Sequence, residues 1–458
     1  MKVAHIVRRF SRAEWGGTET VVAALVAEQR RRGDEVRVFC TSALQPPEGT
    51  CEAEAFGYFY PSFPLSATAR DALDRKGGSP FAPGLFRAVR AFRPDVIHVH
   101  AGGRLATCAI RLAERLGVPS VLSLHGGAAV VPPQELAAMR APLRHTIPYG
   151  GVLDRLLGLR FDPLARASAL VCLSRTEERA LVARYPRQCV RYLPNGVPPG
   201  AFAHRSFERA ARILCVSRLD YQKNQLAFVD LLAARPEVSV ELIGPVTAPW
   251  YRDEILAQAK ARGVAGRLTV SDARAPGSDA LHAAFARADV FVLPSVHEPF
   301  GIVALEAMQH GVPLVASAVG GLVDFVRDGE NGLLFNPAEK GALAAAVGRL
   351  TPELAVRLVA GGLVTAQAFA WPRLVADLAG IYCEAGQGAR HETRDEAGQG
   401  ERHETRDAKV EGERHETRDE RSSQVSRLAS LSCLASHVSR PPSTPSGPTP
   451  FTPKGDPS

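Results

Sequence analysis

The chain has 458 residues, 45% of them apolar, so it is long enough for two domains with substantial cores. Residues 1–385 carry 44 Lys and Arg against 36 Asp and Glu, and this net charge of +8 suits an anionic partner such as a sugar nucleotide, a nucleic acid or an anionic lipid surface. The absence of any run of about 20 apolar residues argues against a spanning helix.

Short apolar segments alternate with longer helical patterns along the chain. Continuous apolar runs of this length are typical of parallel strands buried on both faces. The helices between them, for example Thr18–Arg32 and Pro299–His310, indicate an α/β fold of doubly wound layers. The predicted strands are Val3–Val7, Val36–Phe39, Val96–Val99, Ser120–Leu124, Ala169–Leu173, Ile213–Val216, Val238–Ile243, Leu268–Val270, Val290–Leu293 and Leu314–Ala316.

The alternation restarts after a loop rich in Pro and Gly at residues 193–200, which is therefore the best domain boundary. It predicts two Rossmann-like domains, residues 1–195 and 196–366, that face a cleft. A cleft between domains is a favoured ligand site.

Residues 386–458 differ in kind from the rest of the chain. The hexapeptide Arg-His-Glu-Thr-Arg-Asp begins at residues 390, 402 and 414, and Pro and Ser dominate from Arg440 onward. A period of 12 without an apolar face cannot bury a core. We expect this low-complexity tail to be disordered.

Two cations follow the predicted strand Ile213–Val216, in the segment Ser-Arg218-Leu-Asp-Tyr-Gln-Lys223-Asn. Ligands of α/β folds bind beyond the carboxyl ends of the strands. Positioned cations there stabilise the negative charge that grows on a departing diphosphate, and they do so without a metal ion. On spacing alone, a surface pair at a helix start is the competing interpretation.

The segment from His297 to Glu306 follows the strand Val290–Leu293. Pro299 suits the first turn of a helix, and the free amides of the next residues would form a phosphate site at the positive end of the helix dipole. Glu306 lies eight residues after Glu298, so a continuous helix would place both carboxylates on one face, towards a sugar and a ribose. The alternative is a capping Glu298 and a solvated Glu306.

The first predicted domain contributes two further candidate ligand contacts. Gly16 and Gly17 precede the first long helix and let the backbone approach a ligand, although they do not form a dinucleotide-binding GxGxxG motif. His125 follows the predicted strand Ser120–Leu124, where it would hydrogen-bond a sugar hydroxyl, and a structural histidine is the alternative. We interpret His98 and His100, within a strand, as packing or polar core groups, and no spacing argues for a zinc site.

The combination resembles family-4 glycosyltransferases over most of residues 1–385. The matching segments are GGTE (16–19), DVIHVH (95–100), LHGG (124–127), LPNGV (193–197), SRLDYQKN (217–224), HEPFGIVALEAMQHGVPLVAS (297–317), GG (320–321) and DGENGLLF (328–335).

The resemblance implies the GT-B fold, an acceptor domain followed by a donor domain, and transfer with retention of anomeric configuration. By position, Arg218 and Lys223 resemble diphosphate ligands, Glu306 the ribose ligand, and Glu298 the contact to the donor sugar. It also implies a last helix, residues 367–385, that crosses back to the first domain, with Trp371 in a packing role. The remaining implied contacts are His125 to sugar or acceptor, and a donor site that includes Gly16, Gly17, Asn195, Phe300, Gly301, Ile302 and Val303.

The sequence thus predicts a retaining glycosyltransferase that uses a nucleoside-diphosphate sugar without a metal or other cofactor. Its acceptor would be a glycan, a lipid-linked molecule or a small molecule in glycan, glycolipid or cell-envelope biosynthesis. The alternatives are another GT-B reaction, namely a sugar phosphorylase or a sugar-nucleotide epimerase, and a non-catalytic GT-B partner subunit. Nucleic-acid binding lacks any recognition motif.

The predicted location is the cytoplasm. The chain starts directly with a strand-like segment rather than a signal peptide, and its eight scattered cysteines form no CxxC pair, as expected of buried reduced thiols. Peripheral contact with the cytoplasmic membrane surface is a further expectation, for which Arg30, Arg31 and Arg32 at a helix end are one candidate.

Overall fold

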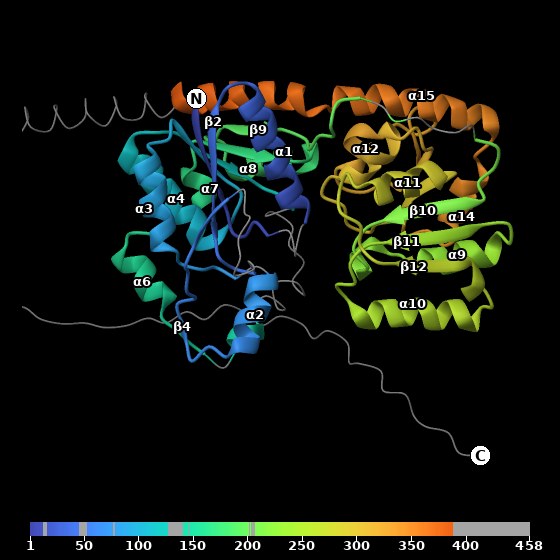
Figure 1. Ribbon diagram of the computed structural model, residues 1–458, viewed down its shortest axis with the longest axis horizontal. Coiled ribbons are helices and arrows are strands. Elements are labelled where there is room, and N and C mark those ends of the chain that lie inside the picture. Colours follow the sequence, from blue (N-terminus) through green and yellow to red (C-terminus); the bar gives the residue numbers. More distant parts are fainter. Residues whose placement is uncertain are drawn as a thin grey trace, which may run out of the picture. The chain divides into compact units, whose positions relative to one another are not determined.

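A computed structural model describes residues 1–11, 16–44, 53–76, 78–126, 141–144, 146–200, 202 and 207–387 of the chain. These residues form two parallel β-sheets, one within residues 2–192 and the other within residues 212–335 (Figure 1). The tail predicted to be disordered lies, apart from its first two residues, outside the described residues.

The first sheet has seven parallel strands in the order β3-β2-β1-β5-β6-β8-β9. The strands are β1 (Lys2–Val7), β2 (Glu35–Thr41), β3 (Glu54–Phe56), β5 (Val96–Val99), β6 (Ser120–Ser123), β8 (Ala169–Cys172) and β9 (Val190–Tyr192). The helices that alternate with them are α1 (Gly17–Arg31), α3 (Pro83–Phe92), α4 (Gly103–Leu116), α7 (Pro163–Arg166) and α8 (Arg175–Arg184). Further elements are β4 (Ser62–Phe63), α2 (Ala67–Lys76), η2 (Ala141–Leu143), β7 (Ile147–Pro148) and α6 (Gly150–Leu156).

The second sheet has six parallel strands in the order β12-β11-β10-β13-β14-β15. Numbered along the sheet's own sequence, this is the order 3-2-1-4-5-6 of a Rossmann fold, which reverses between β10 and β13. The strands are β10 (Arg212–Val216), β11 (Ser239–Ile243), β12 (Leu268–Ser271), β13 (Val290–Leu293), β14 (Leu314–Ser317) and β15 (Leu333–Phe335). The helices are η3 (Tyr221–Lys223), α9 (Ala227–Ala234), α10 (Pro249–Ala261), η4 (Ala265–Arg267), α11 (Asp279–Arg287), α12 (Ile302–Gln309), α13 (Leu322–Phe325), α14 (Ala342–Gly348) and α15 (Pro352–Ala368).

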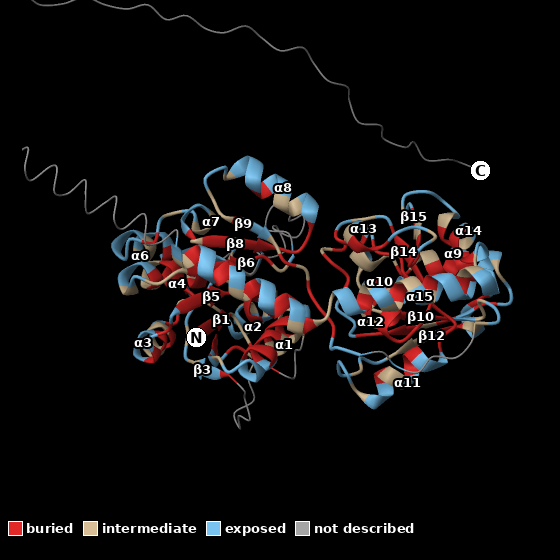
Figure 2. Cartoon of the chain, turned by 90° about the horizontal axis from the view of Figure 1, so that it is seen from above, coloured by how far each residue is buried: buried red, intermediate tan, exposed pale blue. Residues whose placement is uncertain are grey.

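Helices cover both faces of each sheet, so the strands are buried on both sides. In the second sheet, one apolar cluster joins the strands to α9, α10 and α14, and another joins them to α11 and α12. Figure 2 shows the strands as buried and the helices as buried inside and exposed outside. This arrangement explains why the strands appear in the sequence as continuous apolar runs. The predicted doubly wound α/β class is confirmed.

The helix at residues 371–387 packs on the first sheet, although it comes last in the described chain. Trp371, Leu378 and Tyr382 share one apolar cluster with Val3 of β1 and Val22 of α1. Trp371 is buried at the start of this helix, where its amide donates a hydrogen bond to the carbonyl of Val197. The side chain of Trp371 therefore packs, as the resemblance implied.

The ten predicted strands are all present, with ends that differ by one or two residues. The prediction did not include the edge strands β3, β9 and β15, each of three residues, which are too short to show an apolar period. Of the six described cysteines, Cys40, Cys108, Cys172 and Cys215 are buried, Cys189 is half-buried and Cys383 is exposed. No helix among the described residues is long and apolar enough to cross a membrane.

Candidate functional site

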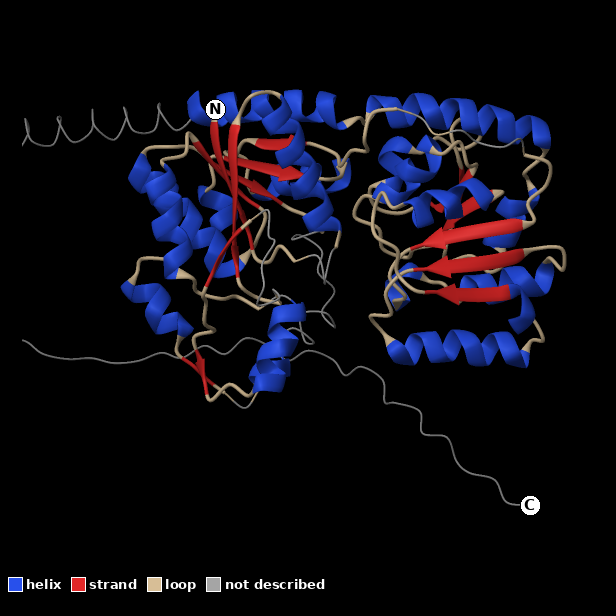
Figure 3. Ribbon diagram, in the orientation of Figure 1, coloured by secondary structure: helices blue, strands red, loops and turns tan. Residues whose placement is uncertain are grey.

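The point where the strand order of the second sheet reverses lies between β10 and β13. The strands of this sheet point to the same edge (Figure 3). Arg218 and Lys223 follow β10, and Glu298 follows β13. Because open α/β sheets bind ligands at the carboxyl ends of the strands where the order reverses, these three side chains stand at the expected ligand position.

Lys223 and Glu298 form a nearly buried ion pair. Nζ of Lys223 lies 2.7 Å from Oε2 of Glu298, and the two side chains are 13% and 9% exposed. The hydroxyl of Ser295 donates to the same carboxylate oxygen at 3.2 Å. Lys223 ends the short helix η3, whose first turn is capped by the Asp220 carboxylate. The two residues that the sequence placed after separate strands are thus in direct contact.

Arg218 is exposed, and among the described residues its guanidinium has no hydrogen-bond or ion-pair partner. Its backbone carbonyl accepts a hydrogen bond from the buried Gln225 at 2.7 Å, which fixes the chain there while the side chain stays available. The site therefore holds one cation bound to a carboxylate and one cation free to meet a ligand.

The loop that carries Glu298 is held by the strand next to β13. The hydroxyl of Ser317, the last residue of β14, donates to the carbonyl of Ser295 at 2.5 Å, and the amide of Gly321 donates to the carbonyl of Glu298 at 3.0 Å. Gly320 has a φ of +53°, and a Cβ there would lie 1.9 Å from the Glu298 carbonyl oxygen. Only glycine fits at such a close approach of two backbone segments.

The helix after Glu298 begins later than predicted. α12 starts at Ile302, and Gly301 stands at its N-cap with a φ of +93°. The prediction that Pro299 occupies the first helical turn is wrong, because the chain first turns through a left-handed glycine. Glu298 therefore lies in the loop, and the prediction that Glu298 and Glu306 share one helix face is also wrong.

The predicted phosphate contacts at residues 300–303 differ in how far their side chains are buried. Phe300 is buried and packs against Phe325 and Phe369 with its ring tilted to theirs, so only its amide is available to a ligand. Gly301 is buried, whereas Ile302 and Val303 are half-buried at the start of α12. Amides at the start of a helix attract anions.

Glu306 lies in the middle of α12 and is half-buried. Loss of water around the side chain raises the pKa of its carboxyl to about 7. Glu306 forms no ion pair with the described residues, and a carboxyl whose pKa is raised by loss of water is a candidate functional group.

The predicted glycine contacts lie at the start of α1, with Gly16 at the N-cap and Gly17 as the first helical residue. The Gly16 amide donates to Oε2 of Glu19 at 3.2 Å, while Glu19 also pairs with Arg9. Gly17 is exposed, with open space where a Cβ would be. Asn195 is buried in the segment after β9. The loop residues 12–15 next to Gly16, and Gly127 of the LHGG motif, lie outside the described residues.

His125 follows β6 and is half-buried. Its Nε2 lies 2.7 Å from Nδ1 of His100, and Nε2 of His100 lies 2.8 Å from Nδ1 of His5. His98 contacts Ser123 through Nε2 and Tyr382 through Nδ1, both at 2.7 Å. His98 and His100 are therefore polar core groups, as predicted, and they belong to a connected network that includes His125.

Three buried imidazoles bring ligand atoms close enough together for a metal ion to be considered. The atoms of His5, His98 and His100 lie within 4.8 Å of one another. Both ring nitrogens of each residue are, however, already engaged in hydrogen bonds of 2.7–2.8 Å. A tetrahedral zinc with bonds of about 2.0–2.1 Å would hold two ligand nitrogens more than 3 Å apart. The geometry fits hydrogen bonding rather than metal ligation.

The sequence reasoning missed the residues that support the site. Ser295, Ser317 and Gln225 are fully buried polar residues. Ser317 of β14 bonds Ser295, which follows β13, and no pattern within either segment marks that contact. Gln225 bonds Ser217 and Arg218 of its own segment. His5 was also missed, although β1 and β5 pair with His5 opposite His98. A polar residue within an otherwise apolar strand was the available signal.

Comparison with known proteins gives two family matches that together span most of the two sheets. Residues 15–201 match the model of Glycosyltransferase Family 4, and residues 201–353 match that of Glycosyl transferases group 1. The chain is 31% identical over 400 residues to the D-inositol 3-phosphate glycosyltransferase of Acidothermus cellulolyticus, which covers 81% of this chain and 86% of the relative. It is 30% identical over 314 residues to the glycogen synthase of Mycobacterium tuberculosis, which covers 66% and 71%.

Solved structures share the fold at lower identity. Anabaena Alr3699/HepE in complex with UDP has a TM-score of 0.60 and 20% identity, and the match covers 83% of this chain and 99% of that one. Sucrose-phosphate synthase from Thermosynechococcus elongatus has a TM-score of 0.60 and 21% identity, with coverage of 84% and 98%. These neighbours show the GT-B fold, and with the family matches and the relatives they establish that the chain belongs to the family-4, group 1 glycosyltransferases.

Proposed function

We propose that this enzyme transfers a sugar from a nucleoside-diphosphate sugar to an acceptor hydroxyl with retention of anomeric configuration, in glycan, glycolipid or cell-envelope biosynthesis. The observation that carries the proposal is that the Lys223–Glu298 ion pair and the exposed Arg218 follow β10 and β13, between which the strand order of the second sheet reverses. The solved neighbours that contain UDP and UDP-glucose support a nucleotide-sugar donor.

Each group has a defined part in the proposed donor complex. Lys223 has three N–H donors, so it keeps its bond to Glu298 and still reaches a phosphate oxygen. Arg218 supplies the second positive charge, and the amides at the start of α12 supply further donors. Glu298 accepts hydrogen bonds from sugar hydroxyls, and Glu306 accepts them from the ribose.

The proposed reaction needs no enzymic base. The acceptor hydroxyl attacks the anomeric carbon from the face that the diphosphate leaves, and the departing phosphate takes the proton. Arg218 and Lys223 stabilise the charge that grows on the phosphate as the glycosidic bond breaks, so the protein supplies the positive charge that a metal ion provides in other transferases.

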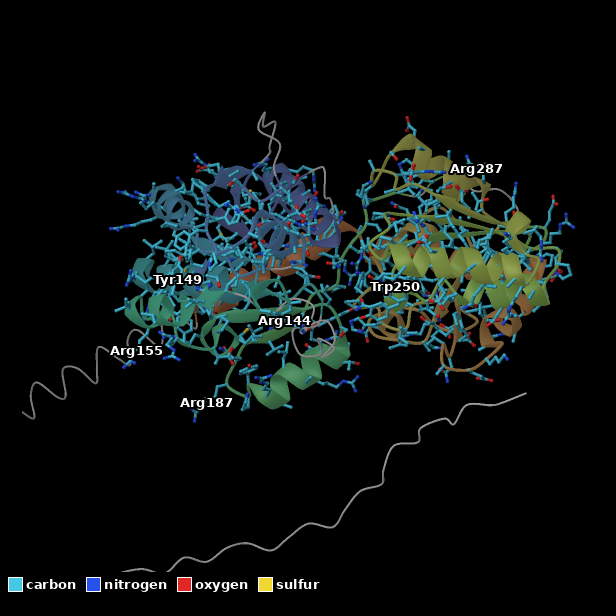
Figure 4. The ribbon with its side chains drawn as sticks, turned by 90° about the horizontal axis from the view of Figure 1, so that it is seen from below. Arg144, Tyr149, Arg155, Arg187, Trp250 and Arg287 are labelled. Carbon is cyan, nitrogen blue, oxygen red and sulfur yellow. The ribbon has the colours of Figure 1, made fainter. Side chains whose placement is uncertain are left out.

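Replacement of Arg218 by Ala tests the proposal with little effect on the fold, because the side chain is exposed and has no partner among the described residues. Loss of one such donor lowers kcat by about 10²–10³-fold. Arg287→Ala is the matched control, since this exposed arginine (labelled in Figure 4) ends α11 and precedes β13, whereas Arg218 follows the carboxyl end of β10. If Arg218→Ala turned over as fast as Arg287→Ala and the wild-type protein, the proposed site would be overturned.

A thermal-shift panel of nucleoside diphosphates and nucleotide sugars identifies the base and the sugar. A ligand that binds the folded protein raises its melting temperature. Assays with donor plus acceptor and with donor plus phosphate separate transfer from phosphorolysis. Binding without turnover in either assay would favour the non-catalytic partner.

We also propose a peripheral contact with the cytoplasmic membrane surface. The paired short strands β4 and β7 and the helix α6 expose Phe63, Ile147 and Leu156, which are 71%, 73% and 79% accessible. Arg144 and Arg155 are exposed in the same part of the chain (Figure 4). Exposed apolar residues with arginines favour an anionic lipid surface. Arg30 and Arg31, in contrast, already bond to the Val36 carbonyl and to Glu28.

Sedimentation with vesicles tests this contact. Leu156→Glu is expected to reduce binding to vesicles that contain an anionic lipid, whereas Val356→Glu, at a similarly exposed position on α15, is the matched control. Equal binding of both variants would contradict the contact at α6.

A further inference from the structure

A continuous series of hydrogen bonds connects Gln29 of α1 to His125. Oε1 of Gln29 lies 2.7 Å from Nε2 of His5, Nδ1 of His5 lies 2.8 Å from Nε2 of His100, and Nδ1 of His100 lies 2.7 Å from Nε2 of His125. Gln29, His5 and His100 are buried, and His125 is half-buried. Only Nδ1 of His125 has no partner among the described residues.

Each imidazole in this series is neutral near pH 7. Burial lowers the pKa of His5 and of His125 to about 4, and it lowers the pKa of His100 well below its usual value. A neutral imidazole has one N–H donor and one acceptor nitrogen. A bond at one nitrogen therefore decides what the other nitrogen can do.

The direction of the series starts at Gln29. Its Oε1 can only accept, so Nε2 of His5 carries the proton and Nδ1 of His5 accepts. His100 then donates from Nε2 and accepts at Nδ1, and His125 donates from Nε2. The free Nδ1 of His125 is left with a lone pair.

The Tyr382 hydroxyl bonds the other end of the Gln29 amide. Nε2 of Gln29 donates to the Tyr382 hydroxyl at 3.2 Å, and the hydroxyl then donates its own hydrogen to Nδ1 of His98 at 2.7 Å. His98 consequently donates from Nε2 to Ser123. A rotated Gln29 amide would reverse every bond in the network, so the orientation of this one amide determines all four histidine tautomers.

We propose that Gln29 is a positioning residue that sets the tautomer of His125, so that His125 presents Nδ1 as a hydrogen-bond acceptor to the ligand. An unprotonated nitrogen repels a phosphate oxygen and accepts from a hydroxyl. The group that meets His125 is therefore a sugar or acceptor hydroxyl, not a phosphate. The contact with substrate rests on the proposed function, whereas the tautomer itself does not.

The wild-type tautomer is measured without substrate. Long-range ¹H–¹⁵N spectra of the full chain distinguish protonated from unprotonated ring nitrogens, and His125→Gln identifies the signals of His125. We expect a proton on Nε2 and none on Nδ1 of His125 at pH 7.5. A proton on Nδ1 would overturn the proposal.

Gln29→Met tests the role of the amide, because it keeps the side-chain length and removes the acceptor. His125 is expected to populate both tautomers, with a proton partly on Nε2 and partly on Nδ1. Gln309→Met is the matched control: Gln309 is equally buried, but it bonds the carbonyls of Pro198 and Gly200 instead of a histidine, so the His125 tautomer should stay as in wild type. An unchanged tautomer in Gln29→Met would overturn the proposal.

Tyr382→Phe provides a second variant in case Gln29→Met does not fold. It keeps the ring and removes the hydroxyl that bonds the amide, so a mixed His125 tautomer is again expected. An unchanged His125 tautomer in a folded Tyr382→Phe would contradict the control of Gln29 by Tyr382.

Kinetics then separate the tautomer from the proposed function. If His125 accepts a hydroxyl, Gln29→Met lowers kcat/KM by roughly 2- to 10-fold, the effect of one weakened hydrogen bond. A mixed tautomer with unchanged kcat/KM would contradict the hydroxyl contact and leave the tautomer control established. No turnover in the wild-type protein would contradict the proposed function alone.

Discussion

Burial holds the pKa of Glu306 at about 7, so this carboxyl is partly protonated in the free enzyme at neutral pH. Ribose hydroxyls that donate to it favour the carboxylate and lower its pKa on binding. We expect binding of a nucleotide sugar, whose diphosphate carries no proton at pH 6, to release a proton at that pH, and its affinity to rise with pH up to about 7. Calorimetry in buffers of different ionisation enthalpy measures this release.

Glu306→Gln is the control for this titration. The amide cannot ionise, so the dependence of the binding enthalpy on buffer should disappear. A wild-type enthalpy that is the same in all buffers would contradict the role of Glu306 at the ribose.

Lys223 has two roles, and a single substitution of this residue would affect both. Its removal weakens phosphate binding, and it also leaves the nearly buried Glu298 without its cation. Breaking such a pair destabilises a protein by about 3–5 kcal/mol. We therefore expect Lys223→Met to lower the free energy of unfolding strongly and Arg218→Ala to leave it nearly unchanged, as measured by urea denaturation.

The double variant Lys223→Met with Glu298→Gln separates the two effects. It removes both charges, so much of the lost stability should return while donor binding stays weak. A double variant less stable than Lys223→Met would show that the pair is not the cause.

At the scale of elements, the loop of Glu298 depends on the backbone of the segment after β14. Gly320→Ala would place a Cβ 1.9 Å from the Glu298 carbonyl oxygen and displace that loop. We expect weaker donor binding in a protein that still folds, measured by titration with the nucleotide that the thermal-shift panel selects.

Gly329→Ala is the matched control. Gly329 also has a positive φ, +77°, but open space surrounds the position of its Cβ. Both variants carry the strain of a left-handed alanine, on the order of 1 kcal/mol, and only Gly320→Ala moves the loop. Equal donor affinity in the two variants would contradict the proposed dependence.

The sequence predicted the elements well where the signal is local. The apolar strands and the cations after β10 followed from short patterns. The start of α12 did not, because Pro299 suggested a helix whereas Gly301 and the contact of Gly320 with Glu298 determine the turn. That contact joins residues from two loops, and no pattern within either loop contains it.

The histidine network is a second case in which local sequence patterns did not reveal contacts between distant segments. His98 lies in β5 and His100 directly follows it, and the sequence indicated packing or polar core groups for both. His98 bonds Tyr382, from the end of the described chain, and His100 bonds His5, which in turn bonds Gln29 of α1. The sequence therefore predicted a polar core without its connection to His125.

At the scale of the whole molecule, the neutral histidines make the folded state sensitive to acid. Unfolded His5 binds a proton below about pH 6.5, whereas folded His5 does so only near pH 4. The contribution of His5 to the free energy of unfolding is therefore fully present above pH 6.5 and is lost as the pH falls towards 4. His5 alone accounts for a loss on the order of 3 kcal/mol once the pH is below 4, of which about 2 kcal/mol should appear between pH 7.5 and pH 5 in urea denaturation.

His5→Gln should reduce this pH dependence, because it removes a group that titrates only after unfolding. His297→Gln is the control, since His297 has no bond to the network. Equal pH dependence in wild type and His5→Gln would contradict the contribution of His5.

The packing of the helix at residues 371–387 on β1 and α1 has a consequence for how the chain folds during its synthesis. A ribosome makes the first sheet long before it makes Trp371, Leu378 and Tyr382, which complete the apolar cluster on one face of that sheet. The nascent first half therefore exposes part of its core while the second half is made. The Gln29 amide also lacks the Tyr382 hydroxyl until then, so His125 acquires its fixed tautomer only after the last helix has left the ribosome.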